Sequence, residues 1–183
     1  MSGTWHTFPM MSFETGRLTL RPWTLEDADF VFDLYSRWEV QRFIGKAPQV
    51  MADRSEALAR LANWMSPDHA VHGIWAVEEK EYGRLVGVLL LKPIPASRDA
   101  VDPPQDTEIG WHFHPDSWGR GYASEAAAVI VRHAFNNGLE QVVAVTNPSN
   151  SASRRVCLRI GMRHLGQTAA YYDTTCELYA AAP

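Results

Sequence analysis

The chain has 183 residues, of which 46% are hydrophobic and 21% charged, a balance that fits one globular domain and excludes a disordered chain. The formal net charge is −4 and no run of five basic residues occurs, so nucleic acid is a poor candidate partner. No stretch approaches the roughly 18 apolar residues of a membrane span, so we expect no membrane partner either.

The N-terminus and the cysteines set the expected context of the domain. Residues 1–11 lack the cationic start and apolar run of a signal peptide. We expect residues 1–12 to be a flexible leader and residues 13–183 to form a single domain. Cys157 and Cys176 form neither a disulfide framework nor a CxxC metal pair, which favours a reducing compartment and hence a cytoplasmic location.

The first elements are a strand and two helices. Residues 17–22 alternate polar and apolar side chains and predict a strand with Leu18 and Leu20 inward. Thr24 followed by Asp27 has the spacing of a helix-capping box, and apolar residues recur at helical spacing through Tyr35. A second helix is predicted over residues 53–65.

The middle of the chain predicts three strands. Residues 73–77 and 85–91 are apolar runs joined by the polar connection 79–83, which indicates a hairpin. Four prolines mark residues 93–105 as a loop, and residues 107–113 form the next strand.

The C-terminal third alternates helices and strands. A helix is predicted over residues 122–135, with Gly138 as its stop signal, followed by a short buried strand at 142–145. A helix over 150–160 ends at Gly161, and residues 171–179 close the chain in extended form. This order predicts a mixed α/β sheet with a parallel pair where the long helix crosses over.

The segment between residues 108 and 125 carries the most chemical information. A strand runs into a turn containing Gly119 and Gly121, which opens a helix of small residues. Glycines let the backbone approach a ligand closely, and the free N–H groups of a first helical turn bind anions, so a pyrophosphate is the natural guest. A tight turn without a ligand is the alternative.

Two other phosphate-binding motifs fail here. A P-loop needs Lys followed by Ser or Thr after its last glycine, and neither follows Gly121. The dinucleotide fingerprint needs an acidic residue at the C-terminal end of the second strand, whereas Glu140 precedes that strand.

The segment Trp118-Gly-Arg-Gly121-Tyr-Ala123 resembles the acetyl-CoA pyrophosphate loop of the GNAT superfamily, whose pattern is Gln/Arg-x-x-Gly-x-Gly/Ala, with Trp118 in place of the usual first residue. Three further segments resemble the branch of the ribosomal-protein N-terminal acetyltransferases. They are Arg17-Leu-x-Leu-Arg-Pro22, Glu108-Ile-Gly-Trp111, and Asn150-x-x-Ser153-x-x-Val156 with Gly161-Met162.

The resemblance implies a fold and a co-substrate. The fold is a single α/β (α+β) domain: a mixed, mostly antiparallel sheet flanked by helices, with a splayed parallel strand pair. Acetyl-CoA is the implied co-substrate, with no metal. Its pantetheine arm would enter the splay and pair with the backbone near His112 and Phe113, where an amide N–H would stabilise the thioester oxyanion. The other implied cofactor-binding residues are Trp118, Gly119, Arg120, Gly121, Tyr122, Ala123, Ser124, Asn150 and Ser153.

The resemblance also implies catalytic roles for an amine that attacks directly in a ternary complex. Glu108 matches the position of a catalytic carboxylate, as a base or relay, or else as a structural carboxylate or substrate anchor. Many relatives carry a tyrosine acid where this chain has Cys157, and Ser153 is the alternative proton donor or a plain cofactor contact. His112 is either a proton relay or a hydrogen-bonded histidine; paired with His114 it lacks a third zinc ligand.

The acceptor remains open at this level. A peptide or protein N-terminus and a small-molecule amine both fit the resemblance, and a homodimer and a monomer are both compatible with it. Residues 171–173 either close the cleft or pack, and Trp38, Trp64, Trp75 and Trp111 either line it or fill cores. A catalytically silent acyl-CoA-binding module is the alternative of a different class.

Overall fold

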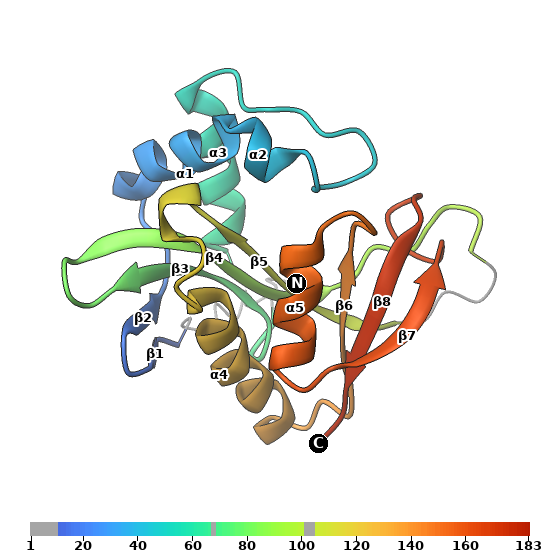
Figure 1. Cartoon of the computed structure of the whole chain (residues 1–183). Helices are drawn as coiled ribbons and strands as arrows, with labels where there is room; N and C mark the ends of the chain where they lie inside the picture. The colour runs from blue at the N-terminus through green and yellow to red at the C-terminus, as the bar shows by residue number, and fades with distance from the viewer. Residues whose placement is uncertain (1–10, 67–68, 101–104) are drawn as a thin grey trace, which may run out of the picture.

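The computed structural model describes residues 11–66, 69–100 and 105–183, which form one mixed α/β layer structure. Its sheet has eight strands in the order β1-β2-β3-β4-β5-β6-β8-β7, with helices on both faces (Figure 1). The strands are β1 Phe13–Glu14, β2 Leu18–Arg21, β3 Gly73–Glu79, β4 Arg84–Pro93, β5 Thr107–Phe113, β6 Val142–Thr146, β7 Arg163–Thr168 and β8 Cys176–Ala181. The helices are α1 Ala28–Ser36, α2 Trp38–Gln41, α3 Arg54–Trp64, α4 Tyr122–Asn136 and α5 Ser151–Arg159.

The N-terminal prediction is confirmed in detail. Leu18 and Leu20 of β2 are fully buried on the same face of the sheet. Asp27 accepts a hydrogen bond from the Thr24 backbone N–H at 2.8 Å, the reciprocal contact of a capping box, and a short 3-10 turn then leads into α1.

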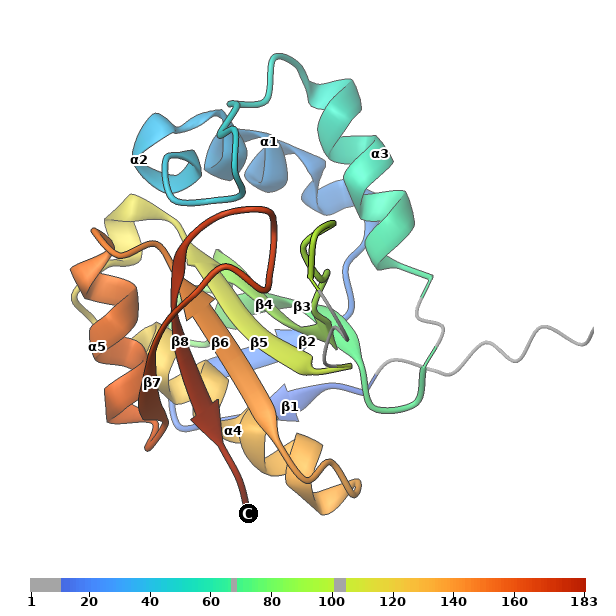
Figure 2. The ribbon, with the colours of Figure 1, turned by 90° about the vertical axis from the view of Figure 1, so that its right-hand side faces the viewer.

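Two apolar layers sandwich the sheet. On one face α4 packs through Ala126, Ala127 and Ile130 against β2 to β6 and β8, and Cys157 of α5 closes the same core. On the other face α1 and α3 cover the inner part of the sheet (Figures 1 and 2). Each helix presents one apolar stripe to the sheet, which explains why its apolar residues recur at helical spacing.

The sheet is antiparallel except at one place. β3, β4 and β5 pair in antiparallel register along their lengths, as the predicted hairpin requires. β5 and β6 are parallel, and α4 connects them as the crossover helix. The expected parallel pair is therefore confirmed.

Three elements were missed by the sequence patterns. β1 and α2 are too short to show a period, and β7 is an exposed edge strand whose residues show no apolar alternation. The extended end predicted at 171–179 is partly wrong. Residues 171–175 form a loop in which Tyr172 and Asp173 have φ values of 58° and 52°, and β8 begins only at Cys176.

The predicted leader overlaps the edge of the described chain. Residues 1–10 lie outside the described residues, but the Met11 carbonyl accepts a hydrogen bond from the Trp75 indole at 2.8 Å. Met11 is thus hydrogen-bonded to β3, although it lies within the segment predicted to be a flexible leader. No helix in the described ranges is long and apolar enough to cross a membrane.

Candidate active site

The strands β5 and β6 separate shortly after they meet. Their only registered pair within the described residues joins Glu108 to Val143, at the start of both strands. β5 continues to Phe113 with its other edge still paired to β4. The C-terminal half of β5 therefore turns one backbone edge toward the space between the two strands.

The backbone groups on that edge belong to the odd-numbered residues. The His114 N–H donates to the Val86 carbonyl of the β4 side at 2.9 Å. In an antiparallel pair alternate residues point their backbone groups to opposite sides, so His112 also faces β4. Trp111 and Phe113 then face β6. Of the two residues expected to offer backbone groups here, Phe113 faces this edge, whereas His112 faces β4 and Trp111 takes its place.

The glycine turn has the backbone shape that the sequence indicates. Gly119 and Gly121 have φ values of 76° and 79°, in the left-handed region that favours glycine. A Cβ atom at Gly119 would meet nothing within 4 Å, so backbone conformation and not crowding explains this glycine. Gly121 is the N-cap of α4, and the first-turn N–H groups of Tyr122, Ala123 and Ser124 point out of the helix start.

Arg17 fixes one side of this turn. Its guanidinium donates to the Arg120 carbonyl at 3.0 Å and forms an ion pair with Glu125 of α4 at 2.6 Å. Burial opposes ionisation of Glu125, but the hydrogen bonds from Thr15 and Arg17 hold the pKa of its carboxyl below the usual value. The strand motif and the glycine turn, distant in sequence, are thereby joined.

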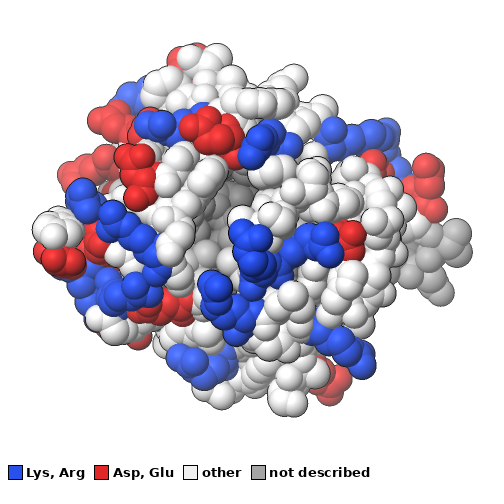
Figure 3. Space-filling model, viewed as in Figure 1, with Lys and Arg blue, Asp and Glu red and all other residues white. Residues whose placement is uncertain are grey.

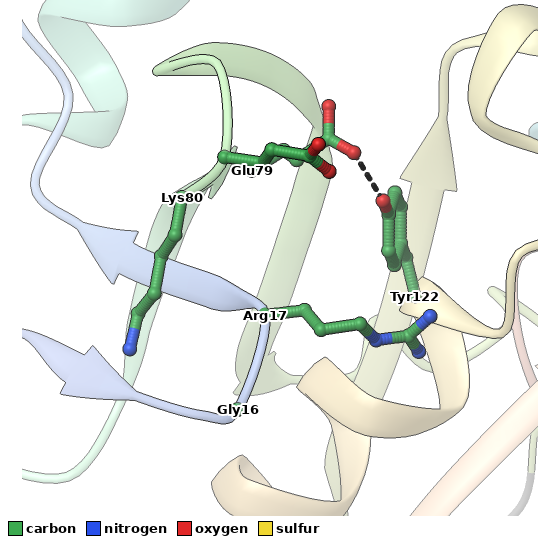
Figure 4. A pocket seen from close by; sticks show the side chains of 6 residues that line it. Gly16, Arg17, Glu79, Lys80 and Tyr122 are labelled. Atoms are coloured by element: carbon green, nitrogen blue, oxygen red, sulfur yellow. Dashed lines mark hydrogen bonds between the residues drawn. The ribbon is translucent and has the colours of Figure 1, made fainter.

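Glu79 fixes the other side and was not anticipated, because it lies in the polar run assigned to a hairpin connection. Its carboxylate is buried and accepts hydrogen bonds from the Tyr122 hydroxyl and from Arg84 at 3.0 Å, with Arg120 at 3.4 Å. The Tyr122 hydrogen bond and Arg84 lower the pKa of Glu79. Figure 4 shows Arg17 and Tyr122 together at the start of α4, with Glu79 reaching the tyrosine. A pocket opens beside them, lined by Gly16, Arg17, Glu79, Lys80, Glu81 and Tyr122.

The remaining cofactor candidates lie on α5. Asn150 is the N-cap of this helix, and its side-chain oxygen accepts from the Ser153 N–H at 3.1 Å. Ser153 is half-buried one turn before Cys157. Cys157 is fully buried in the core, and burial raises the pKa of its thiol to about 12. A thiol in that environment is inert, as expected for a core cysteine.

Trp118 occupies the first position of the loop pattern but does not offer a ligand the hydrogen-bond donor that Gln or Arg would supply there. Its indole N–H donates to the Phe113 carbonyl at 2.8 Å, and the ring is half exposed. The tryptophan thus fastens the turn to the end of β5. Its one polar group is directed at the protein backbone.

Glu108 lies at the closed end of the splay and is buried. One of its carboxylate oxygens accepts a hydrogen bond from the Tyr172 hydroxyl and lies 3.2 Å from the Lys92 ammonium. Lys92 also donates to the Tyr172 hydroxyl at 2.9 Å. Burial and the Glu108 charge raise the pKa of Tyr172, so this phenol stays protonated and donates to the carboxylate.

The loop that carries Tyr172 is held over the sheet by a second loop. Asp173 forms an ion pair with Arg98 at 2.8 Å, and Ser97 donates to the Ala169 carbonyl at 2.7 Å. The Tyr171 hydroxyl donates to Asp106 at 2.5 Å. Residues 171–173 are therefore packed against Arg98 and Asp106 and, through Tyr172, against Glu108.

The two histidines beside the turn both contact α1. His112 is half-buried, and its Nδ1 lies 2.7 Å from the Tyr35 hydroxyl. Burial lowers the pKa of His112 to about 4, with a further contribution from the charges of Arg60 and Lys92. The strand ends before His114, whose Nε2 lies 3.0 Å from Asp33. A histidine with such a low pKa is a weak base, which favours the hydrogen-bonded role of His112 over a proton relay.

The predicted aromatic lining is mostly core. Trp75 is fully buried, and Trp64 and Trp111 pack against the two main cores. Trp38 of α2 is 56% exposed. Among the described residues, no group of three or more His, Cys, Asp or Glu side chains could hold a metal ion.

The surface above these elements is hollowed and bordered by cations. Figure 3 shows a hollow near the middle of the face, with Lys and Arg side chains along its border over α5. α5 carries Arg154, Arg155 and Arg159. A cationic rim beside a helix N-terminus suits a polyanionic ligand.

Comparison with known proteins agrees with this geometry. The profile of the acetyltransferase (GNAT) domain matches residues 17–163. The chain is 29% identical over 176 residues to the uncharacterized N-acetyltransferase YoaA of Bacillus subtilis, covering 91% of this chain and 94% of that protein. It is 32% identical to the FsC-acetyl coenzyme A-N(2)-transacetylase of Aspergillus fumigatus, covering 89% of this chain and 69% of that protein.

Solved structures show the same fold. A GNAT-family acetyltransferase from Bacillus anthracis superposes with a TM-score of 0.75 at 24% identity, covering 94% of this chain and 98% of that one. RimL, a ribosomal L7/L12 alpha-N-protein acetyltransferase in complex with coenzyme A, superposes with a TM-score of 0.71 at 17% identity, covering 92% and 95%.

Proposed function

The chain belongs to the GNAT family of acetyltransferases, and on that premise we propose that it moves the acetyl group of acetyl-CoA to a primary amine. The observation that carries the proposal is the separation of β5 from β6 directly beside a glycine turn and the N-terminus of α4. One edge of β5 can pair with an extended amide chain, while the helix start receives a pyrophosphate.

We assign the cofactor contacts to three segments. The turn and first helical turn, residues 118–124, would hold the pyrophosphate through backbone N–H groups. The edge groups of Trp111 and the N–H of Phe113, whose carbonyl already accepts from the Trp118 indole, would pair with the pantetheine arm, and Asn150 and Ser153 would contact it from α5. Bound acetyl-CoA supplies an activated thioester, and an edge N–H of β5 would donate to the oxygen on which negative charge develops.

The amine must be neutral when it attacks, so its proton has to leave. We propose that Glu108 accepts this proton, directly or through a water. Its position at the closed end of the splay supports this role. Its contacts with Lys92 and Tyr172 also fit the competing role of a structural carboxylate, so the two roles need separate readouts.

The departing thiolate can leave as the anion or take a proton. We propose Ser153 as the donor, taking a proton from solvent water as it passes on its own, because it is half-buried on the first turn of α5 next to the capping Asn150. Cys157, which stands where many relatives have a tyrosine, is enclosed in the core. This one observation favours the alternative function, a catalytically silent acyl-CoA-binding module.

We propose that the acceptor is either a peptide or protein N-terminus or a small-molecule amine. The similarity to RimL supports the first class and the similarity to the Aspergillus transacetylase supports the second. A cytoplasmic location is supported by Cys157 and Cys176, which are buried and free. A homodimer remains a proposal that sedimentation can test.

The experiment is a screen of amines with acetyl-CoA, following release of the CoA thiol. The panel contains peptides with free alanine, serine and methionine N-termini, the same peptides with blocked N-termini, and polyamines and free amino acids. Thiol release with free but not blocked amines supports transfer. Binding of acetyl-CoA without release on any amine of the panel would favour the silent module.

A further inference from the structure

Three arginines lie around the start of α4, and they differ in their partners. Arg17 is paired with Glu125, and Arg120 lies 3.4 Å from Glu79. Both guanidinium groups are therefore compensated by carboxylates. Both ion pairs stabilise the glycine turn before α4.

Arg159 is the exception. It sits in the last turn of α5, is exposed, and its Nη1 lies 3.5 Å from the Ser124 hydroxyl. Ser124 is 8% exposed and belongs to the first turn of α4. Within the ranges that the structure describes, no carboxylate lies within ion-pair distance of Arg159. A guanidinium is thus held at the helix start with only a neutral oxygen as a partner, at the outer limit of a hydrogen bond.

The loop itself lacks a cation at its usual place. The family pattern begins with Gln or Arg, and here Trp118 directs its only donor to the Phe113 carbonyl. A site for a doubly charged pyrophosphate is therefore short of one donor on the loop side. Arg159 reaches the same helix start from the neighbouring helix.

We propose that Arg159 binds the pyrophosphate of acetyl-CoA and replaces the donor that Trp118 does not supply. The inference rests on the proposed function, because it assumes that α4 receives the cofactor. Arginine is suited to this role, since its planar fork donates two hydrogen bonds to phosphate oxygens. The competing explanation is that Arg159 only stabilises the C-terminus of α5 through the helix dipole.

The test is calorimetric titration of acetyl-CoA into the full chain and three variants. Arg159→Ala should weaken binding roughly tenfold, the effect of losing a charge-assisted hydrogen bond, and Arg159→Lys should recover part of it. The matched control is Arg132→Ala, an exposed arginine ten residues along α4 and about 15 Å from its start. The control should bind within about twofold of the parent, which sets the size of a purely global charge effect.

Two further arms separate the explanations. Dephospho-CoA lacks the 3′-phosphate, so an equal loss for Arg159→Ala with this ligand supports the pyrophosphate, and disappearance of the loss would overturn it. A second result is that Arg159→Ala and Arg132→Ala bind acetyl-CoA with equal affinity while only Arg159→Ala has a lower melting temperature without ligand. That result would show that Arg159 only stabilises the C-terminus of α5. If the parent chain itself failed to bind acetyl-CoA, the proposed function would fall, whereas parental binding unaffected by Arg159→Ala would remove this inference alone.

Discussion

At the scale of single residues, Glu108 is the group whose role decides the chemistry. Its carboxylate is buried and shared between a lysine and a tyrosine from two different segments. If Glu108 is a base, removing its charge while keeping its shape should affect the reaction rate. If it is a structural carboxylate, the same change should affect stability.

Glu108→Gln should lower kcat at neutral pH at least about 100-fold if Glu108 removes the amine proton, because general bases contribute that much. The affinity for acetyl-CoA should stay within about twofold, and the variant should regain activity as the pH rises toward the pKa of the amine, where the neutral amine forms without a base. Steady-state kinetics between pH 5 and 9 measure both. A normal profile accompanied by a lower melting temperature would make Glu108 a structural carboxylate that holds Lys92 and Tyr172.

At the scale of elements, the turn before α4 depends on glycine for two separate reasons. Both loop glycines need positive φ, and the pyrophosphate proposed to bind here would also need room and no negative charge at the helix start. Another glycine, Gly138, needs a positive φ but lies away from the proposed pyrophosphate site. Gly138, after α4, has a φ of 87° and open space around it.

Gly121→Glu should weaken acetyl-CoA binding at least tenfold, because a carboxylate would stand beside the phosphates. Gly138→Glu is the matched control, with the same backbone strain and the same charge change at the other end of the helix. Titration of acetyl-CoA into both variants compares them directly. Equal affinities would mean that the cofactor does not approach the start of α4.

The elements also show what the sequence could and could not reveal. The strand at 17–22, the glycine turn and the helix from 122 were predicted because local periodicity and glycine chemistry define them. β7 was missed because an edge strand buries little and shows no alternation. Glu79 was missed because its partners Tyr122, Arg84 and Arg120 meet it only in the folded sheet. Local patterns carry no signal for such contacts.

At the scale of the whole molecule, buried charges tie stability to pH. The pKa of Glu79, Glu125 and Asp27 is lowered by hydrogen bonds and ion pairs, so their contributions are present above the unfolded carboxyl pKa and are lost on acidification. His112 acts in the same direction. Its pKa falls from 6.5 to about 4, so the unfolded chain binds more protons between these values.

Unfolding by urea should therefore show a free energy that declines as the pH falls from about 6.5 toward 4, before the carboxylates titrate fully. His112→Gln should flatten this part of the curve, because it removes the group whose protonation is suppressed in the fold. Urea titrations at half-unit pH steps measure the slope for both proteins. An identical slope in the variant would show that His112 is not buried in its neutral form.

The cofactor and the amine are proposed to bind on opposite faces of the sheet. α4 and α5 lie on the face where the cofactor contacts are proposed, and α1, α2 and the loop at 169–175 surround the other face (Figure 2). Glu108 contacts Tyr172 of that loop, and His112 contacts Tyr35 of α1. The amine and the cofactor would then approach the gap between β5 and β6 from opposite faces, which fits direct attack.

The most direct measurement of the central claim is thermal unfolding of the chain with acetyl-CoA, CoA or NAD at saturating concentration. A ligand present at about 100 times its dissociation constant adds roughly 2.7 kcal/mol of stability, which shifts the melting temperature visibly. The account predicts a rise with acetyl-CoA and CoA and none with NAD. No rise with either CoA form would contradict it, because the glycine turn would then be only a turn.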